Sequence, residues 1–299
     1  MMKKMMSLIL ALLLCASLSA ALAGSEDLLE EDPLSLWRLD ENIPVSLDLN
    51  GDGQTEDVEW RTLEIDEWET AVEVSVIWQD GTPVFYDTEA LYPVGVYAVD
   101  LDGDGAVELL ISGDEMSDDY ATYCLRCADG GLEPVDIENV YYGMYEWDSE
   151  EYYKLGYGMV SAIGENSVTL SGWRDVLGTF WGSRTYSLQG GRLVAADDGL
   201  WVFDEWMDPD AWDYRYLTLT QELSVTFTVE DGYSFGKLGP GDELFICASD
   251  LQNVVYFITR EAQPRSGYFS VAPNAADGWG LLVGGVPEDE MFEFLPYAG

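Results

Sequence analysis

Short runs of alternating apolar and polar residues recur along almost the whole chain, and this period of two is typical of half-buried β-strands. Clear examples are "AVEVSVIW" at 71–78, "NSVTLSGW" at 166–173 and "LSVTFTV" at 223–229. Helical periodicity is nearly absent after the first 23 residues. Turn-forming pairs separate the runs, namely Asp80-Gly81, Gly130-Gly131, Gly190-Gly191, Asp231-Gly232 and Gly239-Pro240. The sequence therefore predicts an all-β protein.

Three units of roughly 50 residues follow one another, at 44–87, 95–136 and 155–198, and such self-similarity indicates a repeat architecture. Each unit ends in a turn followed by a short strand and an acidic residue. The first two units carry a related acidic stretch, "DLNGDG" from Asp48 and "DLDGDG" from Asp100. In the third unit "IGENSV" stands where the acidic stretch would be.

A change of composition after the third unit suggests a domain boundary. The segment "LWVFDEWMDPDAWDYRY" at 200–216 is acidic and aromatic and breaks the repeat. The remainder has the strand and turn pattern of a small five-stranded barrel. The predicted organisation is a signal peptide at 1–23, a β-repeat domain at 24–199, a connector at 200–216 and a small β-barrel at 217–299.

The N-terminal segment has the layout of a secretory signal. Lys3 and Lys4 precede an apolar run, and Ala21-Leu22-Ala23 places small residues where a signal peptidase reads them, so we expect cleavage after Ala23. The apolar run is shorter than the ~20 residues that span a bilayer, which argues against a membrane anchor. A lipoprotein is disfavoured because the large Leu14 precedes Cys15. We therefore expect a secreted or cell-surface protein with no membrane insertion after cleavage.

The charge of the chain excludes some partners and favours others. The 299 residues include 57 acids, 13 basic residues and no histidine, which gives a formal net charge of −44. Such a surface repels nucleic acid and anionic membranes and attracts divalent cations. A hydrophobic fraction of 47% with 11 tryptophans and 18 tyrosines provides enough apolar surface for a core.

The two acidic stretches have the residue pattern of cation-binding loops. Carboxylates at alternate positions, followed by glycine at position six, can turn their oxygens toward one ion, which offsets their mutual repulsion. Hard oxygen donors without a soft ligand favour Ca²⁺ over zinc or copper. We expect two Ca²⁺ ions per chain. The candidate ligands are Asp48, Asn50, Asp52, the Gln54 carbonyl and Glu56 in the first loop, and Asp100, Asp102, Asp104, the Ala106 carbonyl and Glu108 in the second.

The closing ligand could lie at position nine or at position twelve of each loop. The first loop fits the EF-hand pattern literally because Glu59 occupies position twelve, but the second loop has Ile111 there. Both loops have glutamate at position nine. An EF-hand also needs a flanking helix on each side, whereas "VSL" and "VGVYAV" before the loops and "VELLIS" after the second read as strands. We therefore favour position nine and a strand–loop–strand site.

The stretches "DLNGDGQTEDV" and "DLDGDGAVELL" resemble the FG-GAP, or VCBS-type, repeats of integrin-like β-propellers, over roughly residues 25–198. In that family a D-x-[DN]-x-D-G-x-x-[DE] loop joins two strands of a blade and holds calcium. The resemblance implies a partial β-propeller-like domain of about three blades; an open propeller and a β-sandwich of the same blades both remain open. The C-terminal part resembles a small Src-homology-three-like barrel by pattern alone.

The three cysteines after the signal do not indicate a zinc site, because a second ligand pair and all histidines are missing. Cys124 and Cys127 lie in a strand-like run, where positions three apart face opposite sides and are too far apart for a disulfide. We interpret them as strand residues, and a bridge from one of them to Cys247 after export remains open.

Three functions compete on this sequence. The first is a non-enzymatic, calcium-stabilised extracellular protein that binds cell-wall, glycan or protein ligands through an aromatic surface. The second is a secreted glycoside hydrolase with paired carboxylates; the lack of histidine excludes Ser-His-Asp and Cys-His chemistry. The third is a purely structural envelope protein. We favour the first, on analogy with the repeat family.

Overall fold

A computed structural model describes residues 33–89, 91–115, 119–128, 130–138, 155–196, 199–203, 215–274 and 280–297. The chain divides into two units, 1–36 and 37–299, and all the strands belong to the second. The predicted signal peptide, with Cys15 and the cleavage position, lies outside the described residues. The prediction of an all-β protein is confirmed: within the described ranges the only helix is the short α2 (Glu288–Met291).

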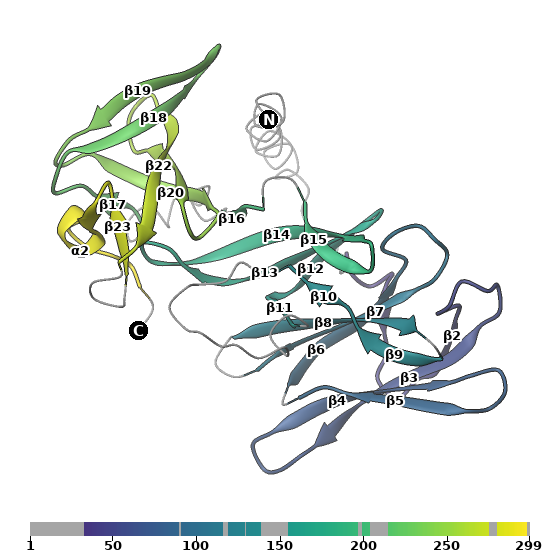
Figure 1. Cartoon of the computed structure of the whole chain (residues 1–299). Coiled ribbons are helices and arrows are strands. Elements are labelled where there is room, and N and C mark those ends of the chain that lie inside the picture. Colours follow the sequence, from purple (N-terminus) through teal and green to yellow (C-terminus); the bar gives the residue numbers. More distant parts are fainter. Residues whose placement is uncertain are drawn as a thin grey trace, which may run out of the picture. The chain divides into compact units, whose positions relative to one another are not determined.

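Each of the three predicted units contains a four-stranded antiparallel meander (Figure 1). The first meander consists of β2 (Val45–Leu47), β3 (Glu56–Glu64), β4 (Thr70–Ile77) and β5 (Pro83–Asp87). The second consists of β6 (Tyr92–Val99), β7 (Glu108–Asp114), β8 (Tyr120–Ala128) and β9 (Gly131–Pro134), and the third of β12 (Met159–Gly164), β13 (Ser167–Asp175), β14 (Thr179–Gln189) and β15 (Arg192–Ala195). In every meander the acidic stretch, or "GENS" in its place, joins the first strand to the second.

Alternation along the strands places one apolar face of each of the first two meanders on a shared core. Val58 and Trp60 of β3 and Val74 of β4 are buried against Leu109 and Ile111 of β7. Fully burying such a side chain stabilises the fold by about 1.5–3 kcal/mol. The second meander gains an edge strand on either side, β1 (Arg38–Leu39) beside β6 and β11 (Leu155–Tyr157) beside β8. The first two units therefore pack face to face.

The third meander belongs to a 14-stranded sheet that continues into the C-terminal part of the chain. From β14 the path runs through β16 (Trp201–Phe203), β20 (Glu243–Ser249), β21 (Val254–Thr259), β22 (Ser266–Pro273) and β18 (Leu223–Val229) to β19 (Gly232–Leu238). The remaining strands join at its sides: β10 (Asp136–Ile137) on β15, β17 (Leu217–Thr218) on β20, β23 (Leu281–Val283) on β22 and β24 (Val286–Pro287) on β23.

Strand pairing and core packing both cross the predicted boundary at 200–216. β16 lies inside the predicted connector and pairs with β14 on one side and with β20 on the other. Phe180 of β14 packs against Phe203 and Phe245, with ring centroids 5.7 and 6.4 Å away. Residues 204–214 of the connector lie outside the described residues. In the described part of the chain no sheet closes, so the predicted barrel at 217–299 is not confirmed.

The cysteines lie in strands, as predicted. Cys124 is buried and Cys127 is half-buried on β8, and Cys247 lies on β20; these three described cysteines are free thiols. Burial raises the pKa of the Cys124 and Cys127 thiols above the ordinary value. A thiol of raised pKa is a weak nucleophile and a weak metal ligand, which fits the interpretation of these residues as strand positions.

Candidate metal centre

The first acidic loop, residues 48–55, folds back on the carboxylate with which it begins. Asp48 accepts hydrogen bonds from the backbone N–H groups of Asp52 (3.2 Å) and Gly53 (2.8 Å). The Asn50 side-chain oxygen accepts a second bond from the Asp52 N–H at 2.9 Å. Gly53 has a φ of +83°, a left-handed conformation that favours glycine. The glycine at position six is therefore required by the turn.

The second loop, residues 100–107, repeats this arrangement. The two carboxylate oxygens of Asp100 accept bonds from the N–H groups of Gly103 (2.7 Å) and Gly105 (3.0 Å). Asp104 accepts from the Ala106 N–H at 2.8 Å, as Asp52 accepts from the Gln54 N–H in the first loop at the same distance. The roles of the Gln54 and Ala106 carbonyls as ligands remain predictions.

Three carboxylates converge in the second loop. Ligand oxygens of Asp100, Asp102 and Asp104 all lie within 4.8 Å of one another. Asp102 is exposed, and its slight desolvation together with the charges of Asp104 and Asp100 raises its pKa above the ordinary value. Like charges held this close favour either protonation or a cation. The first loop has an amide, Asn50, at the position of Asp102 and therefore carries one charge fewer.

The glutamates at position nine occupy matching places in the first two meanders, where Glu56 begins β3 and Glu108 begins β7. Glu56 is fully buried and accepts a bond from the Leu49 N–H at 3.1 Å. Glu108 is 4% exposed and accepts a bond from the Leu101 N–H at 2.9 Å. Burial raises the pKa of Glu108 to about 7, and the neighbouring aspartates add to the shift. In both loops a buried carboxylate at position nine is thus tied to the backbone at position two.

The EF-hand alternative requires Glu59 to close the first loop, and the strand geometry opposes it. Both loops lie between strands, β2 and β3 in one case and β6 and β7 in the other, as predicted. Because side chains alternate along a strand, Glu59 lies on the opposite face of β3 from Glu56. Ile111, at position twelve of the second loop, is buried in the apolar core. The arrangement favours position nine.

The two loops contact each other, a contact that no local sequence pattern predicts. The Val107 N–H donates a 3.0 Å hydrogen bond to the Asp48 carbonyl. A Cβ on Gly51 would lie 3.4 Å from the Ala106 nitrogen, and a Cβ on Gly103 would lie 3.5 Å from the Asn166 side-chain oxygen. Loop 48–55, loop 100–107 and turn 164–167 therefore follow one another in space; we call this series the loop ladder.

Gln79 also reaches the candidate site and was missed by the sequence analysis. Its side-chain amide lies just after β4 and donates a 3.2 Å hydrogen bond to the second carboxylate oxygen of Glu56. The two residues are 23 positions apart, and only the pairing of β3 with β4 brings them together. No local pattern marks Gln79, because the neighbouring Asp80-Gly81 pair predicts a hairpin turn and says nothing about a ligand.

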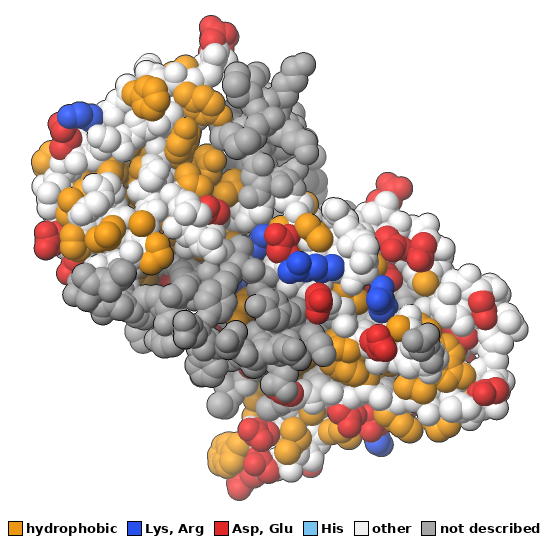
Figure 2. All heavy atoms as spheres, in the orientation of Figure 1, with side chains coloured by type: hydrophobic (Ala, Val, Ile, Leu, Met, Phe, Trp, Pro, Cys, Tyr) orange, Lys and Arg blue, Asp and Glu red, His pale blue; other side chains and the backbone are white. Residues whose placement is uncertain are grey.

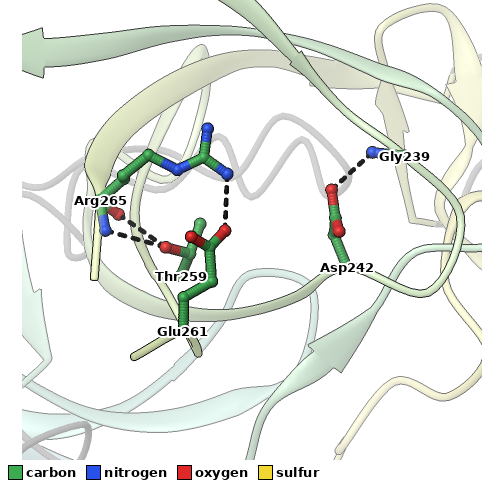
Figure 3. A network of polar contacts seen from close by, with 5 residues as sticks. All are labelled: Gly239, Asp242, Thr259, Glu261 and Arg265. Carbon is green, nitrogen blue, oxygen red and sulfur yellow. Dashed lines mark hydrogen bonds and ion pairs between the residues drawn. The ribbon is translucent and has the colours of Figure 1, made fainter. Parts of the chain in front are cut away.

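Two acidic side chains outside the loops, Asp242 and Glu261, stabilise turns. In Figure 3 the Asp242 carboxylate accepts a 2.7 Å bond from the Gly239 N–H, and Glu261 forms a 2.6 Å ion pair with Arg265. Arg265 is also bonded through its backbone to the Thr259 hydroxyl at 2.9 Å (Figure 3). These two carboxylates shape the ends of β20 and β21, which is a structural role. Among the described residues, Asp100, Asp102 and Asp104 form the only group of three carboxylates or thiolates close enough to share an ion.

Comparison with known proteins gave no match to a protein-family model, to a curated protein or to a solved structure. In the described part of the chain, no helix is long and apolar enough to cross a membrane.

Proposed function

We propose that the chain is a secreted, non-enzymatic extracellular binding protein in which Ca²⁺ stabilises the loops between the first two strands of successive β-units. The observation that carries the proposal is the matched pair of buried glutamates, Glu56 and Glu108. Each accepts a hydrogen bond from the N–H at position two of its own loop, and the same loop carries three further oxygen-bearing side chains. A buried carboxylate in this position is costly without a cation, and a bound divalent ion would compensate it.

The donor set fits calcium chemically. Each loop offers only oxygen donors: carboxylates, backbone carbonyls and, in the first loop, the Asn50 amide. Ca²⁺ accepts six to eight such ligands in flexible geometry, and extracellular modules bind it with a Kd of about 10⁻⁴ to 10⁻³ M. At ~1 mM calcium and a Kd of ~10⁻⁴ M, each site would stabilise the fold by about 1.4 kcal/mol.

The three meanders support, within the same proposal, a partial β-propeller-like domain. A propeller blade is a four-stranded sheet, and each repeat unit here has four antiparallel strands with its loop at the same place. The C-terminal strands are proposed as a smaller β-module that continues the third unit. The binding surface is proposed to be aromatic, because large aromatic side chains such as Trp68, Phe85 and Phe235 are exposed, and such rings stack well on sugars or peptides.

Calorimetric titration of the chelator-treated protein with Ca²⁺ tests the proposal. We expect a stoichiometry near two, with Mg²⁺ binding more weakly because Mg²⁺ demands near-ideal octahedral geometry and gives up its water ligands reluctantly. The variant Asp100→Asn/Asp104→Asn, which keeps the shape of the second loop and removes two charges, is expected to lower the stoichiometry to one. A stoichiometry near zero for the unmodified chain would overturn the proposal.

A further inference from the structure

The first acidic loop contains the dipeptide Asn50-Gly51, the one place in the sequence where glycine follows asparagine. At the other asparagines the next residue is Ile43, Val140, Ser167, Val254 or Ala275. The backbone nitrogen of the next residue can attack an asparagine side chain. Glycine favours this attack because it has no Cβ to hinder it and its backbone rotates more freely. Asn50 is therefore the asparagine of this chain whose neighbour is best suited to such a reaction.

The fold leaves both reacting groups accessible. Asn50 and Gly51 are exposed to solvent. Within the described part of the chain no acceptor bonds to the Gly51 N–H, whereas the N–H groups of Asp52 and Gly53 are bonded to Asp48. A backbone N–H that is held in a hydrogen bond is protected from losing its proton to solvent. The nitrogen that must attack is therefore available.

The side-chain amide of Asn50 is polarised by the loop. The Asp52 N–H donates a 2.9 Å hydrogen bond to the Asn50 side-chain oxygen. Attack on the amide carbon places negative charge on this oxygen, and a donor already directed at it stabilises that charge. The Asn50 amide nitrogen, which must leave, donates a longer bond of 3.3 Å to the Asp52 carboxylate. The turn that shapes the loop therefore also activates the amide.

The loop requires glycine after Asn50, so the reactive pair is part of the fold. Gly51 has a φ of +70°, a left-handed conformation that favours glycine. A Cβ at this position would also lie 3.4 Å from the Ala106 nitrogen in loop 100–107. A bulkier residue that would slow the attack is therefore disfavoured at this position by both the turn and the neighbouring loop.

Surface charge slows the reaction and makes its rate sensitive to salt. The attacking nitrogen must first lose its proton to hydroxide, which an acidic surface repels. The net charge is −44, and Figure 2 shows Asp and Glu side chains scattered over the visible face with few Lys and Arg among them. Salt at ~0.15 M limits this repulsion to a range of about 8 Å. The reaction should therefore be followed in salt, and its rate should rise with pH.

We propose that Asn50 is a site of spontaneous deamidation. The deprotonated Gly51 nitrogen forms a bond to the Asn50 side-chain carbon, the C–N bond of the side-chain amide breaks, and ammonia leaves with a proton from water. Water then opens the resulting succinimide ring. Opening at the side-chain carbon gives aspartate, and opening at the backbone carbon gives isoaspartate, which lengthens the main chain by one carbon. The net change is the gain of one water and the loss of one ammonia, without an oxidant or a reductant.

The consequence for the loop rests on the proposed function. Deamidation to aspartate converts "DLNGDG" into the "DLDGDG" of the second loop and supplies the charge that the first loop lacks. The calcium affinity of such loops depends on the charge of their ligands, so this product should bind calcium more tightly. Isoaspartate displaces the ligands by lengthening the main chain and should bind it more weakly. The chemical step itself does not require calcium.

Peptide mass spectrometry of the full chain, aged in mildly alkaline buffer with salt and chelator, tests the proposal. We expect Asn50 to convert at least about tenfold faster than Asn253, because glycine hinders the attack least. Asn253 is the matched control within the same chain: it lies in an exposed turn and precedes the β-branched Val254. A digest of Asn50→Asp supplies the standard for the aspartate product. A second product of equal mass is isoaspartate, which shows that the ring has formed.

A synthetic peptide of residues 45–56 measures how far the fold hinders the reaction. We expect Asn50 in the full chain to react no more than about tenfold slower than in the peptide, because an exposed loop opens at a small cost in free energy. An Asn50 that stays intact after the peptide has converted, equal rates at Asn50 and Asn253, or conversion without isoaspartate would each overturn the proposal. Failure of the calcium proposal would appear in calorimetry alone and would leave these masses unchanged.

Discussion

The Val107 N–H donates a hydrogen bond to the Asp48 carbonyl, and this bond joins the first residue of one acidic loop to the last residue of the other. The backbone of Asp48 is therefore fixed partly by the second unit. An ion that orders either loop also orders part of its neighbour. If both loops bind calcium, the two sites are expected to be coupled and not independent.

We expect the loss of one site to weaken the other. Glu56→Gln should remove most binding at the first loop and lower the calcium affinity of the second about two- to fivefold, a coupling of ~0.5–1 kcal/mol typical of contacting residues. Calorimetry of Glu56→Gln, Glu108→Gln and the double variant would measure this as a thermodynamic cycle. Strictly additive effects of the two substitutions would contradict the coupling.

The register of the loops can be tested by substituting two glutamates that lie three positions apart on opposite faces of β3, Glu56 and Glu59. Glu56→Gln should weaken calcium binding at the first loop at least tenfold, about 1.4 kcal/mol, because the Glu56 carboxylate is buried and bonded to the loop backbone at Leu49. Glu59→Gln is the matched control and should bind almost normally, because its side chain is on the other face of β3. The reverse result in a calcium titration would show that the EF-hand register is correct.

The stability of the chain should depend on pH through Glu288, which is far in sequence from the acidic loops. Burial raises the pKa of Glu288 above the ordinary 4.5. The hydrogen bond from the Tyr297 hydroxyl opposes this shift, and the charges of Asp289 and Asp175 add to it. A raised folded-state pKa means that the stability contribution is fully present below pH ~4.5 and is lost as the pH rises through the folded-state value. Glu288→Gln should therefore gain stability relative to the unmodified chain as pH increases from ~4.5 toward neutrality.

Urea unfolding of both proteins across that pH range gives the difference between their free energies of unfolding. The titration of the many acids that both proteins share cancels in this difference. The comparison is made with chelator present, so that calcium does not add a second pH dependence. A stability difference that stays constant with pH, or that falls as pH rises, would refute the role of Glu288.

Phe180 is expected to stabilise strands on both sides of the predicted domain boundary. It is fully buried and contacts Phe203 and Phe245, so Phe180→Ala should lower the free energy of unfolding by about 3–5 kcal/mol. The control Phe235→Ala, at an exposed position, should change it by less than about 0.5 kcal/mol. Unfolding followed by tryptophan fluorescence and by circular dichroism should show one shifted transition. Two transitions, of which the later is unaffected by Phe180→Ala, would instead support independent domains at 24–199 and 217–299.

Local patterns were sufficient to predict the strands and the internal shape of the acidic loops. Alternation over "AVEVSVIW" predicted β4, and the glycine at position six predicted a turn at Gly53. These features depend on residues within about ten positions of one another. The choice of Glu56 over Glu59 also rested on a local argument, because both loops have glutamate at position nine and their flanks read as strands.

Long-range pairing could not be read from the sequence. The bond from Val107 to Asp48 joins residues 59 positions apart, and nothing in either loop identifies the other as its neighbour. The pairing of β16 with β20 likewise turns part of an apparent connector into a strand inside a sheet. A three-residue strand such as "WVF" has too few positions to show alternation, and its aromatic residues suit a linker that packs on a surface equally well. Pairing between distant strands is also why the predicted closed barrel is not confirmed.

The loop ladder runs from loop 48–55 through loop 100–107 to turn 164–167. The third member differs from the first two in its contacts. Gly51 of the first loop meets Ala106 of the second, and Gly103 of the second meets Asn166 of the third turn, but the nearest atoms to a Cβ on Gly164 all belong to Ser167 of the same turn. The third turn contacts its predecessor through Asn166 and carries no array of carboxylates, and in the described part of the chain Gly164 makes no close approach to another loop. We infer that it acts as a cap. Terminal units of stacked repeats commonly differ from the internal ones in this way. An extra copy of the second unit would accordingly be accommodated between the second and third units, where both of its neighbours are complementary, and not after the third.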